Sequence, residues 1–260
     1  KTGQISPKHL CETLIRHPKI ELIPNAKVNQ LAWSEGWHAT TENHQTYEAP
    51  ICILTNAYHA KYLNIASHFP FSTIRGQLTY LPENQKTSLL TYPVNYGGYL
   101  TTPIDGWHCL GATFKPKSHH LQLEIEEQNT NLQMLTQQLP ELATRFQMPP
   151  QTLLPGRAAF RTSTPDYLPI IGPIPDEATL QTVYAPLRQG QLKKTAPTCP
   201  ILPHIYINAG HGSRGVISSS LAAEIIAAHI ENEPFPVDQQ TLHALNPARF
   251  LIRAVKRKQI

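Results

Sequence analysis

The chain has 260 residues, with 40% hydrophobic and 15% charged side chains and a formal net charge of +4. This length allows one large domain or two small ones with a sizeable core, and the small charge does not by itself indicate a polyanionic partner. No run approaches the roughly 18 apolar residues of a membrane helix, so no membrane span is expected. The 24 prolines are about 9% of the chain against an average of about 5%, which favours a turn-rich mixed α/β fold.

The four cysteines, at positions 11, 52, 109 and 199, form no CxxC pair. Their scatter favours reduced thiols and therefore a cytoplasmic protein. The N-terminus shows neither Met nor the charged-then-apolar pattern of a signal peptide. We interpret the sequence as an excerpt from a longer protein.

The first seventy residues predict one helix followed by several strands. Ser6-Pro7 is a favourable N-cap and N1 pair, so a helix should run from Pro7 to about His17-Pro18. Short apolar and β-branched runs then predict two strands and an exposed hairpin: 20–23, 26–33 and 36–46. The apolar run 49–57 predicts a central strand buried on both faces. It ends in Asn56-Ala57, where a chain can turn close to a ligand.

Residues past Pro70 predict an antiparallel block and then a long helix. Alternating runs indicate four strands: 73–82, 88–92, 94–102 and 106–113. Asp105-Gly106 is a strong hairpin signal. The helix is expected from about Ser118 to Leu139, with the acids at 124, 126 and 127 on a solvated face. Leu153 to Arg161 predicts a further strand. A Pro-rich segment, 165–175, and a linker near 186–203 complete this part.

A strand, a glycine-rich turn and a helix follow each other over 205–230. Glycines at 210, 212 and 215 allow backbone N–H groups to approach a ligand where a Cβ would collide, and the helix start adds the positive end of its dipole. The helix should bury one face: Val216, Ile217, Leu221, Ile225, Ile226 and His229. The stretch is either a cradle for an anionic or electron-rich ligand or a tight turn, and both interpretations stay open at this point.

Arginines on predicted strands are the next candidates for chemistry. Arg157 and Arg161 lie four residues apart, so both should point to one face of a strand, where a guanidinium can bind a carboxylate; a surface ion pair is the alternative. In Arg75-Gly76-Gln77 the glycine indicates a close backbone approach, or a β-bulge, which the spacing favours. The histidines have no metal-ligand spacing, so no metal site is predicted.

The C-terminal tail carries five cations and no acid. Such a cluster can contact the phosphates of a nucleic acid, and a solvated extension is equally compatible with it. The candidates are Arg249, Arg253, Lys256, Arg257 and Lys258.

Four blocks together resemble the glycine-oxidase-like (D-amino-acid-oxidase-type) FAD enzymes. The resemblance covers nearly the whole chain, and the branch with oxidase halves of bifunctional tRNA-modifying enzymes is most similar, through the Gly-Ser-Arg-Gly run and the tail from Leu245 to Phe250. The blocks are Arg75 to Gln77, Gly111 to Phe114, Arg161 to Gly172, and Gly210 to Gly215.

The resemblance implies a two-domain FAD-dependent oxidoreductase fold with a division into four segments. Residues 1–70 and 166–235 would belong to the FAD domain, 71–165 to an antiparallel substrate domain with a long helix, and 236–260 to a basic tail. The Gly210 to Gly215 run matches the family's flavin-facing block, and the Gly-x-Gly-x-x-Gly turn that holds the FAD pyrophosphate, with the acidic residue that follows it, is expected to lie N-terminal to Lys1. We therefore expect a missing N-terminal Rossmann segment, weak FAD binding and no activity for the chain alone.

The resemblance also implies a reaction. In this family FAD takes a hydride equivalent from the carbon beside a secondary amine, and water hydrolyses the imine. On carboxymethylaminomethyluridine at the wobble position of tRNA this gives aminomethyluridine and glyoxylate. A separate methyltransferase half, which uses S-adenosylmethionine, is absent here. The alternatives are an oxidase of glycine or sarcosine, and a non-catalytic RNA-binding fragment.

The resemblance assigns residues to two roles. Arg161 would bind the substrate carboxylate, and Arg214 is the second catalytic candidate. The remaining positions, with Arg214 again, would contact FAD: Val28, Asn56, Ala57, Gly76, Gln77, Gly210, His211, Gly212, Ser213, Gly215, Val216 and Ile217.

Overall fold

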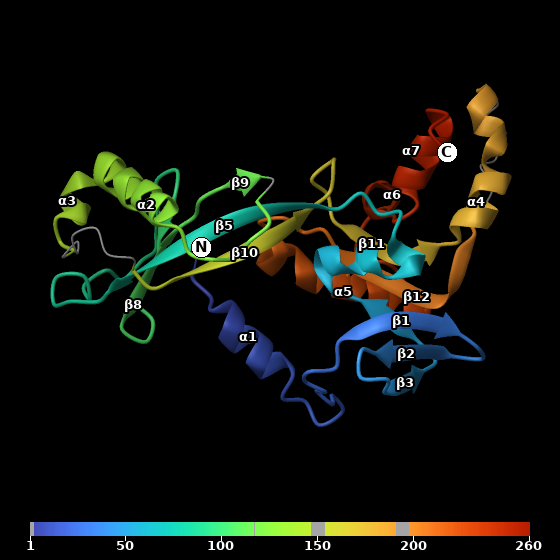
Figure 1. The fold of residues 1–260 in the computed structure, drawn as a ribbon, viewed down its shortest axis with the longest axis horizontal. Coiled ribbons are helices and arrows are strands. Elements are labelled where there is room, and N and C mark those ends of the chain that lie inside the picture. Colours follow the sequence, from blue (N-terminus) through green and yellow to red (C-terminus); the bar gives the residue numbers. More distant parts are fainter. Residues whose placement is uncertain (1–2, 117, 147–153, 191–197) are drawn as a thin grey trace. The chain divides into compact units, whose positions relative to one another are not determined.

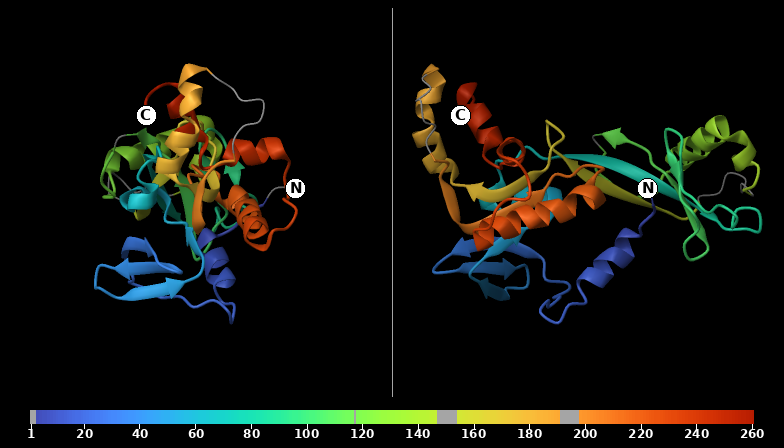
Figure 2. Two further views of the ribbon diagram at one scale, coloured as in Figure 1. Left: turned by 90° about the vertical axis from the view of Figure 1, so that its right-hand side faces the viewer. Right: turned by 180° about the vertical axis from the view of Figure 1, so that it is seen from behind.

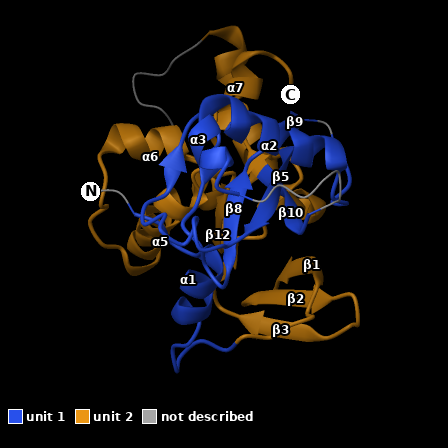
Figure 3. Cartoon of the chain, turned by 90° about the vertical axis from the view of Figure 1, so that its left-hand side faces the viewer, with its two compact units in different colours: residues 1–21, 73–161 blue, residues 22–72, 162–260 orange. Residues whose placement is uncertain are grey.

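The computed structural model describes residues 3–116, 118–146, 154–190 and 198–260 (Figure 1). It divides into two compact units (Figure 3): unit 1 comprises Lys1–Glu21 and Thr73–Arg161, and unit 2 comprises Leu22–Ser72 and Thr162–Ile260. Each unit thus combines two separate stretches of the chain. The expected segment 1–70 is shared between both units, and the expected strand start at Leu153 lies outside the described residues.

Unit 1 is organised around a six-stranded sheet with the order β10-β5-β8-β7-β6, in which β9 also pairs with β5. Its strands are β5 (Ser72–Pro82), β6 (Val94–Asn95), β7 (Tyr99–Leu100), β8 (Trp107–Gly111), β9 (Lys115–Pro116) and β10 (Gly156–Ser163). Its helices are α1 (Pro7–Leu14), α2 (Ile125–Gln138) and α3 (Pro140–Ala143). Leucines dominate its core, which contains Leu81, Leu100, Leu110, Leu135, Ala143 and Phe146.

Local signals correctly predicted one hairpin of unit 1 and the start of its first helix, which ends at Leu14 rather than near His17-Pro18. The Ser6 side chain accepts a hydrogen bond from the His9 amide and α1 begins at Pro7, as predicted. Asp105 and Gly106 have φ of 53° and 81°, the positive values of a two-residue hairpin, and Ile104 pairs with Trp107 across that turn.

The strand expected at 88–92 is wrong. Residues 85–89 form a turn instead, and at its start the Asn84 side chain accepts hydrogen bonds from the amides of Lys86 and Thr87 at 2.8 and 3.1 Å. Side chain to backbone bonds of this kind compete with pairing in a sheet. Leu89 and Tyr92 consequently remain exposed.

The predicted start of the long helix at Ser118 is also wrong, because α2 begins at Ile125. The carbonyls of His120 and Glu124 instead accept hydrogen bonds from side chains of β5, at 3.0 and 2.8 Å. The predicted solvated face needs a second correction. Glu127 is only 6% exposed, since it pairs with the buried Arg75.

Unit 2 contains two three-stranded sheets, with the orders β1-β2-β3 and β11-β12-β4. The strands are β1 (Val28–Trp33), β2 (Trp37–Thr41), β3 (Thr46–Ala49), β4 (Cys52–Leu54), β11 (Ile170–Pro175) and β12 (Ile201–Ala209). The α-helices are α4 (Glu177–Val183), α5 (Gly215–Glu231), α6 (Gln239–Leu245) and α7 (Arg249–Lys256). Short 3-10 helices lie at η1 (Ala57–Tyr62), η2 (Asn64–Ala66) and η3 (Ala185–Gln189). α5 lies along β11 and β12 (Figure 2).

Three expectations about unit 2 need correction. No strand forms at 20–23 because Pro18 and Pro24, which lack a donor N–H, bracket that run. β4 is short and lies at the edge of its sheet, so it is not buried on both faces, and Ile53 is 44% exposed. Ile225 and Ile226 of α5 are buried as predicted, whereas the first part of the expected face is exposed: Val216, Ile217 and Leu221.

The buried face of α5 differs from the predicted one because it includes small residues. Ala222 joins Ile225 and Ile226 in one cluster with Ile171 of β11 and Tyr206 of β12, and Ala228 is also buried. Within the described part of the chain, no helix has the length and apolar character needed to cross a bilayer.

Candidate functional site

The carboxyl ends of β4 and β12 lie side by side in unit 2. The two strands are parallel, with Leu54 opposite Ile207. The chain leaves β4 towards Asn56-Ala57 and leaves β12 at Gly210, so both predicted cofactor segments begin at one edge of the sheet. Ligands of open α/β sheets bind at such an edge.

The turn after β12 uses glycine because its backbone requires it. Gly210 and Gly212 have φ of 80° and 58°, values that glycine adopts without a steric penalty. A Cβ on Gly210 would also lie 2.9 Å from Cγ2 of Thr164. The amide of Gly212 donates to the carbonyl of Thr162 over 2.8 Å. This turn therefore packs tightly against the segment that follows β10.

Thr162 joins the two predicted cofactor segments, and sequence reasoning gave it no role. Its hydroxyl accepts a hydrogen bond from the Tyr58 amide at 3.1 Å, while its carbonyl accepts the Gly212 amide. The residue before Tyr58, Ala57, has a positive φ of 54°, which is unusual for a residue with a Cβ. The polar run that follows Arg161 was the available signal for this link.

The His211 side chain holds the turn to α5. Nε2 lies 2.6 Å from Oδ1 of Asn208, and Nδ1 lies 2.7 Å from Oγ of Ser218. Burial lowers the pKa of His211 below its ordinary value, so the ring is neutral at pH 7. A neutral ring with its proton on Nε2 donates to Asn208 and accepts at Nδ1. Both ring nitrogens are thereby used inside unit 2.

The start of α5 is open to solvent. Helix geometry leaves the N–H groups of Gly215 and Val216 without acceptors inside the helix. Ser213 and Arg214 are exposed, and so are Val216 and Ile217, at 46% and 83%. A ligand at this end would meet amide donors, a positive dipole end and apolar side chains.

Arg161 of unit 1 lies against Gly76. A Cβ on Gly76 would lie 2.7 Å from Cζ and Nη2 of Arg161, so the absence of a side chain makes room for the guanidinium. The close backbone approach, which the spacing had favoured less than a β-bulge, is thus an approach of Gly76 to an arginine. Nη1 donates to the carbonyl of Thr113 at 3.3 Å, the single hydrogen bond of this guanidinium among the described residues. The other donors remain free for a ligand.

Tyr99 is a further candidate near Arg161 that sequence reasoning missed. Burial raises the pKa of its hydroxyl to about 12, and the positive charge of Arg161 opposes that rise. The hydroxyl therefore stays protonated and can donate a hydrogen bond. A tyrosine in an alternating run carries no sequence signal of such a neighbour.

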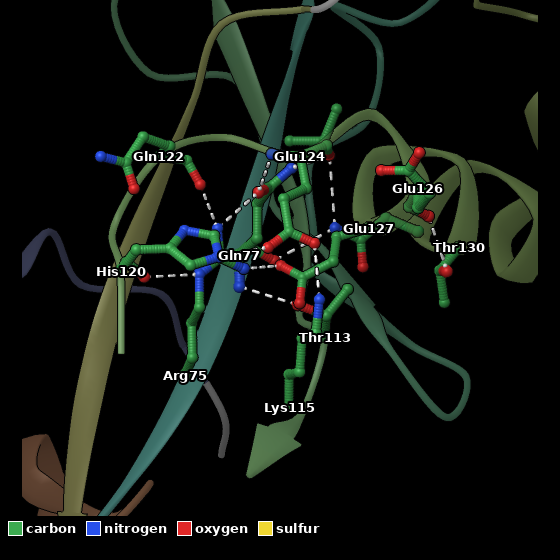
Figure 4. A network of polar contacts seen from close by, with 12 residues as sticks. Arg75, Gln77, Thr113, Lys115, His120, Gln122, Glu124, Glu126, Glu127 and Thr130 are labelled. Atoms are coloured by element: carbon green, nitrogen blue, oxygen red, sulfur yellow. Dashed lines mark hydrogen bonds and ion pairs between the residues drawn. The ribbon is translucent and has the colours of Figure 1, made fainter. Parts of the chain in front are cut away.

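Arg75, whose surroundings are shown in Figure 4, has the opposite environment to Arg161. Its side chain is fully buried and pairs with Glu127 and with the carbonyl of Gln122. Nε donates to the carbonyl of His120 at 3.0 Å, and Nη2 donates to Oε1 of Gln77 at 3.1 Å. Each nitrogen of this guanidinium therefore has a partner within unit 1.

Gln77 belongs to the same network. Its Nε2 donates to the carbonyl of Glu124 at 2.8 Å, and its Oε1 accepts the Glu124 amide at 2.8 Å. Its own amide donates to the hydroxyl of Thr113 at 2.8 Å. The side chain is buried and pairs inside unit 1, while its assignment to FAD stays a prediction.

The five cations of the C-terminal tail have two different environments. Arg249 is 6% exposed and donates to both carboxylate oxygens of Asp166, at 3.1 and 3.0 Å. Arg253 donates to Asp166 at 2.7 Å, with 47% of its side chain exposed. The other cations are exposed at the end of α7: Lys256, Arg257 and Lys258. Arg249 thus has little surface left for a phosphate.

The structure brings together only part of the predicted cofactor set. Asn56 and Ala57 meet the segment from Gly210 to Ile217 through Thr162. Val28 belongs to the separate sheet β1-β2-β3. Gly76, Gln77 and Arg161 belong to unit 1, whereas the turn after β12 belongs to unit 2.

Residues 1–229 match the model of a protein family described as FAD dependent oxidoreductase, or DAO. The chain belongs to this family. It is 38% identical over 260 residues to the tRNA 5-methylaminomethyl-2-thiouridine biosynthesis bifunctional protein MnmC of Ectopseudomonas mendocina (strain ymp), covering 98% of this chain and 39% of that protein. The MnmC protein of Pseudomonas aeruginosa (strain UCBPP-PA14) is 36% identical, with 100% and 40% covered. The chain therefore spans about two fifths of these relatives' length.

Solved structures show the same fold at lower identity. Glycine oxidase from Geobacillus kaustophilus superposes with a TM-score of 0.65 at 17% identity, covering 88% of this chain and 54% of that one. Iminodiacetate oxidase from Chelativorans sp. BNC1 gives a TM-score of 0.61 at 18% identity, covering 86% and 53%. The predicted mixed α/β FAD-oxidoreductase fold, with its antiparallel sheet, is confirmed.

The described residues fit one part of an FAD molecule. Apolar Val216 and Ile217 stand exposed beside the free amides of the α5 start, and this pairing suits a flat ring system with electron-rich carbonyls. Gly212 leaves open space, with no atom within 4 Å of a Cβ placed there. These residues would hold the flavin ring.

Proposed function

We propose that this chain oxidises the carboxymethylaminomethyl group of a modified wobble uridine in tRNA, giving aminomethyluridine and glyoxylate. The observation that carries the proposal is the identity of 36–38% to MnmC proteins over essentially the whole chain. Those relatives are named for the biosynthesis of a methylaminomethyl-thiouridine in tRNA, and a carboxymethylated amine is a chemically suitable precursor. This chain covers 39% and 40% of the length of these two relatives.

Arg161 is suited to bind the carboxylate of this substrate. A guanidinium with free Nη2 and Nε donors can form two parallel hydrogen bonds to a carboxylate. Gly76 and the Thr113 carbonyl fix where that fork lies. Tyr99, protonated and close to the positive charge of Arg161, is suited to donate a further hydrogen bond to the substrate. These groups orient the carbon between carboxylate and amine.

The start of α5 is suited to contact the cofactor. When bound, FAD supplies the two-electron acceptor for oxidation at the carbon beside the amine. The amides of Gly215 and Val216 and the dipole of α5 stabilise negative charge on a group held at this end. His211 is neutral and has both nitrogens engaged, so its role is to hold the turn rather than to move a proton. Arg214, exposed at the N-cap of α5, remains the second candidate for a catalytic contact.

A further segment is part of the proposal. β4 pairs only with β12 among the described strands, and Ile53 is exposed on that edge strand. We propose that an N-terminal Rossmann segment of the same protein completes this sheet and supplies the pyrophosphate site, and that a methyltransferase domain using S-adenosylmethionine acts on the product amine. The proposal also places the protein in the cytoplasm, consistent with its free cysteines.

The test uses the protein at its natural length with FAD bound. Mixed anaerobically with tRNA that carries the carboxymethylaminomethyl group, it should bleach the flavin absorbance and release glyoxylate in equal amounts. Bleaching by free glycine or sarcosine but not by the tRNA would replace the proposal with an amino-acid oxidase. Binding of tRNA without bleaching by any amine would support a non-catalytic RNA-binding role instead. The present chain alone should purify colourless and inactive, and a stoichiometric yellow flavin would contradict that expectation.

A further inference from the structure

The loop of residues 164–169, between β10 and β11, presents an aromatic ring to solvent. Tyr167 is 76% exposed, and its backbone φ of 58° lies in the left-handed region that residues with a Cβ adopt only at a cost. Its amide donates to the Thr164 carbonyl at 3.1 Å, and the Thr164 hydroxyl donates to the Leu168 carbonyl at 2.7 Å. These hydrogen bonds hold the backbone in the conformation that exposes the Tyr167 ring to solvent.

The same loop is joined to α7 by an ion cluster. Asp166 accepts two hydrogen bonds from Arg249 and one from Arg253, at 2.7 to 3.1 Å. Arg249 also donates to the Leu168 carbonyl at 2.8 Å. The position of the Tyr167 backbone is therefore set relative to α7 by a buried arginine.

Exposed cations continue from Arg253 along α7. The helix carries no acid, and its end presents a group of positive side chains: Lys256, Arg257 and Lys258. Arg188 of η3 adds another charge here, because its Nε donates to the carbonyl of Ile260 at 3.0 Å. Asp166 is the one acid that pairs with cations of α7 in the described part of the chain.

An RNA single strand fits this combination better than a lipid surface. A lipid surface would require an exposed apolar face next to the cations, but Leu251 and Val255 of α7 are buried against Leu180 and Tyr184. An exposed aromatic ring beside a positive groove is the arrangement that binds unpaired bases, because every base can stack on it. The cations would lie along the phosphates.

We propose that Tyr167 stacks on an unpaired base of an RNA whose phosphates lie along Arg253, Lys256, Arg257 and Lys258. This inference rests on the proposed function and extends it with a named stacking residue. Thr164, in the same loop, packs against Gly210 of the flavin-facing turn. The stacked base would therefore be a near neighbour of the uridine that is oxidised.

The experiment measures binding of an anticodon stem-loop RNA to the FAD-loaded protein at its natural length, by fluorescence anisotropy over a series of salt concentrations. Tyr167→Ala should weaken binding about tenfold, the size of one lost base stack, with an unchanged salt slope. Tyr167→Phe should bind like the wild type. The triple change of Lys256, Arg257 and Lys258 to Ala should lower the salt slope by about 0.7 for each phosphate contact that is lost.

Tyr167→Gly separates a lost ring from a damaged fold. Glycine adopts the positive φ without strain, so this variant should unfold no earlier than the wild type and yet bind RNA as weakly as Tyr167→Ala. Wild-type affinity in both variants would overturn the proposal. Tyr62→Ala is the matched control, because Tyr62 is 68% exposed in the same unit with the Lys61 ammonium 5.2 Å from its ring centroid. An equal loss in that variant would also overturn it.

Failure of the proposed function would look different. Flavin bleaching by a small carboxymethylated amine does not involve Tyr167, so it should be equal in Tyr167→Ala and the wild type. If no such amine bleaches the flavin while Tyr167→Ala still weakens RNA binding, the oxidation chemistry is wrong and the stacking surface stands. If bleaching occurs and the RNA affinity does not change, the stacking surface is wrong.

Discussion

Arg75 and Arg161 lie on neighbouring strands of one sheet and flank the same glycine, Gly76, but they have opposite surroundings. Arg75 on β5 is fully buried and pairs with Glu127, with Gln77 and with two backbone carbonyls. Arg161 on β10 is half-buried and donates to one carbonyl. The first guanidinium has an internal partner for its charge, and the second has none in the described part of the chain.

The difference separates an arginine that belongs to the fold from one available to a ligand. Burying a charge is costly unless another charge and several hydrogen bonds compensate for it. Arg75 meets that condition through Glu127. Arg161 instead rests on the bare backbone of Gly76 with its fork open, an arrangement that a carboxylate would complete.

The largest expected effect comes from breaking the internal pair. Arg75→Met should lower the free energy of unfolding by about 3–5 kcal/mol, because Glu127 would keep a buried charge without a partner. Urea denaturation of the two proteins measures this loss. The double variant with Glu127→Leu should recover most of it, since no buried charge then remains. A loss below about 1 kcal/mol for Arg75→Met would mean that the pair is open to solvent.

Arg161→Ala should damage binding and chemistry rather than stability. We expect kcat/KM for a carboxymethylated amine to fall about 100-fold, because a charge-assisted bidentate contact disappears, while the free energy of unfolding changes by about 0.5 kcal/mol or less. Steady-state kinetics and urea denaturation measure the two quantities. Arg157→Ala is the matched control on the same strand, since Arg157 is exposed. Equal kinetic losses in both variants would remove Arg161 from the substrate site.

Gly76→Ala should disturb Arg161 alone. The new methyl would lie 2.7 Å from Cζ of Arg161, and the end of that flexible side chain can move away at a smaller cost than the backbone. We expect KM for the carboxymethylated amine to rise about tenfold, with little change in stability. Gly36→Ala is the control, because the nearest atom to its Cβ would be at 3.4 Å. An unchanged KM in Gly76→Ala would show that the position of the fork does not matter.

The smallest expected effect extends the comparison to a third arginine, Arg249. Burial acts to raise the pKa of its partner Asp166, but the hydrogen bonds from Arg249 and Arg253 outweigh that effect and hold the pKa well below its usual range. The folded-state pKa is thus lower than the unfolded value of about 3.9, so the ionised form stabilises the fold above about pH 4 and this stability is lost as the pH falls further.

Denaturation of the wild type and of Asp166→Asn at a series of pH values below 5 measures this contribution. The variant should lose the part of the pH dependence that Asp166 causes. Because the Asp166 side chain is 21% exposed, solvent reduces the effect, and we expect it to be smaller than the loss in Arg75→Met. Identical slopes in both proteins would show that Arg249 and Arg253 do not depend on the charge of Asp166.

Local residue patterns predicted the features whose causes are local. Ser6-Pro7 started a helix, Asp105-Gly106 made a hairpin, and glycines at 210 and 212 occupy positive φ. In each case the physical reason lies within a few residues: a cap, a turn type or the absence of a Cβ. The motif blocks likewise indicated the FAD-oxidoreductase fold.

Contacts between distant residues could not be predicted in the same way. Glu127 was assigned to a solvated face because nothing near it in the sequence indicates that Arg75, fifty-two residues earlier, carries its counter-charge. The link that Thr162 forms between Tyr58 and Gly212 could not be predicted for the same reason, because both partners are distant from Thr162 in the sequence. Helical periodicity predicted that the start of α5 is buried. It does not indicate how far along the helix the underlying sheet extends, and the start of α5 is exposed.

The amino-acid sequence by itself indicated the family, the glycine turn and the candidate role of Arg161. Only the tertiary structure decided which guanidinium is used by the fold and which remains open, because residue type specifies the donors of an arginine but not the acceptors that the folded chain brings to it. The same holds for the tail. Arg249 is buried against Asp166, Arg253 pairs with the same carboxylate, and the last three cations are exposed.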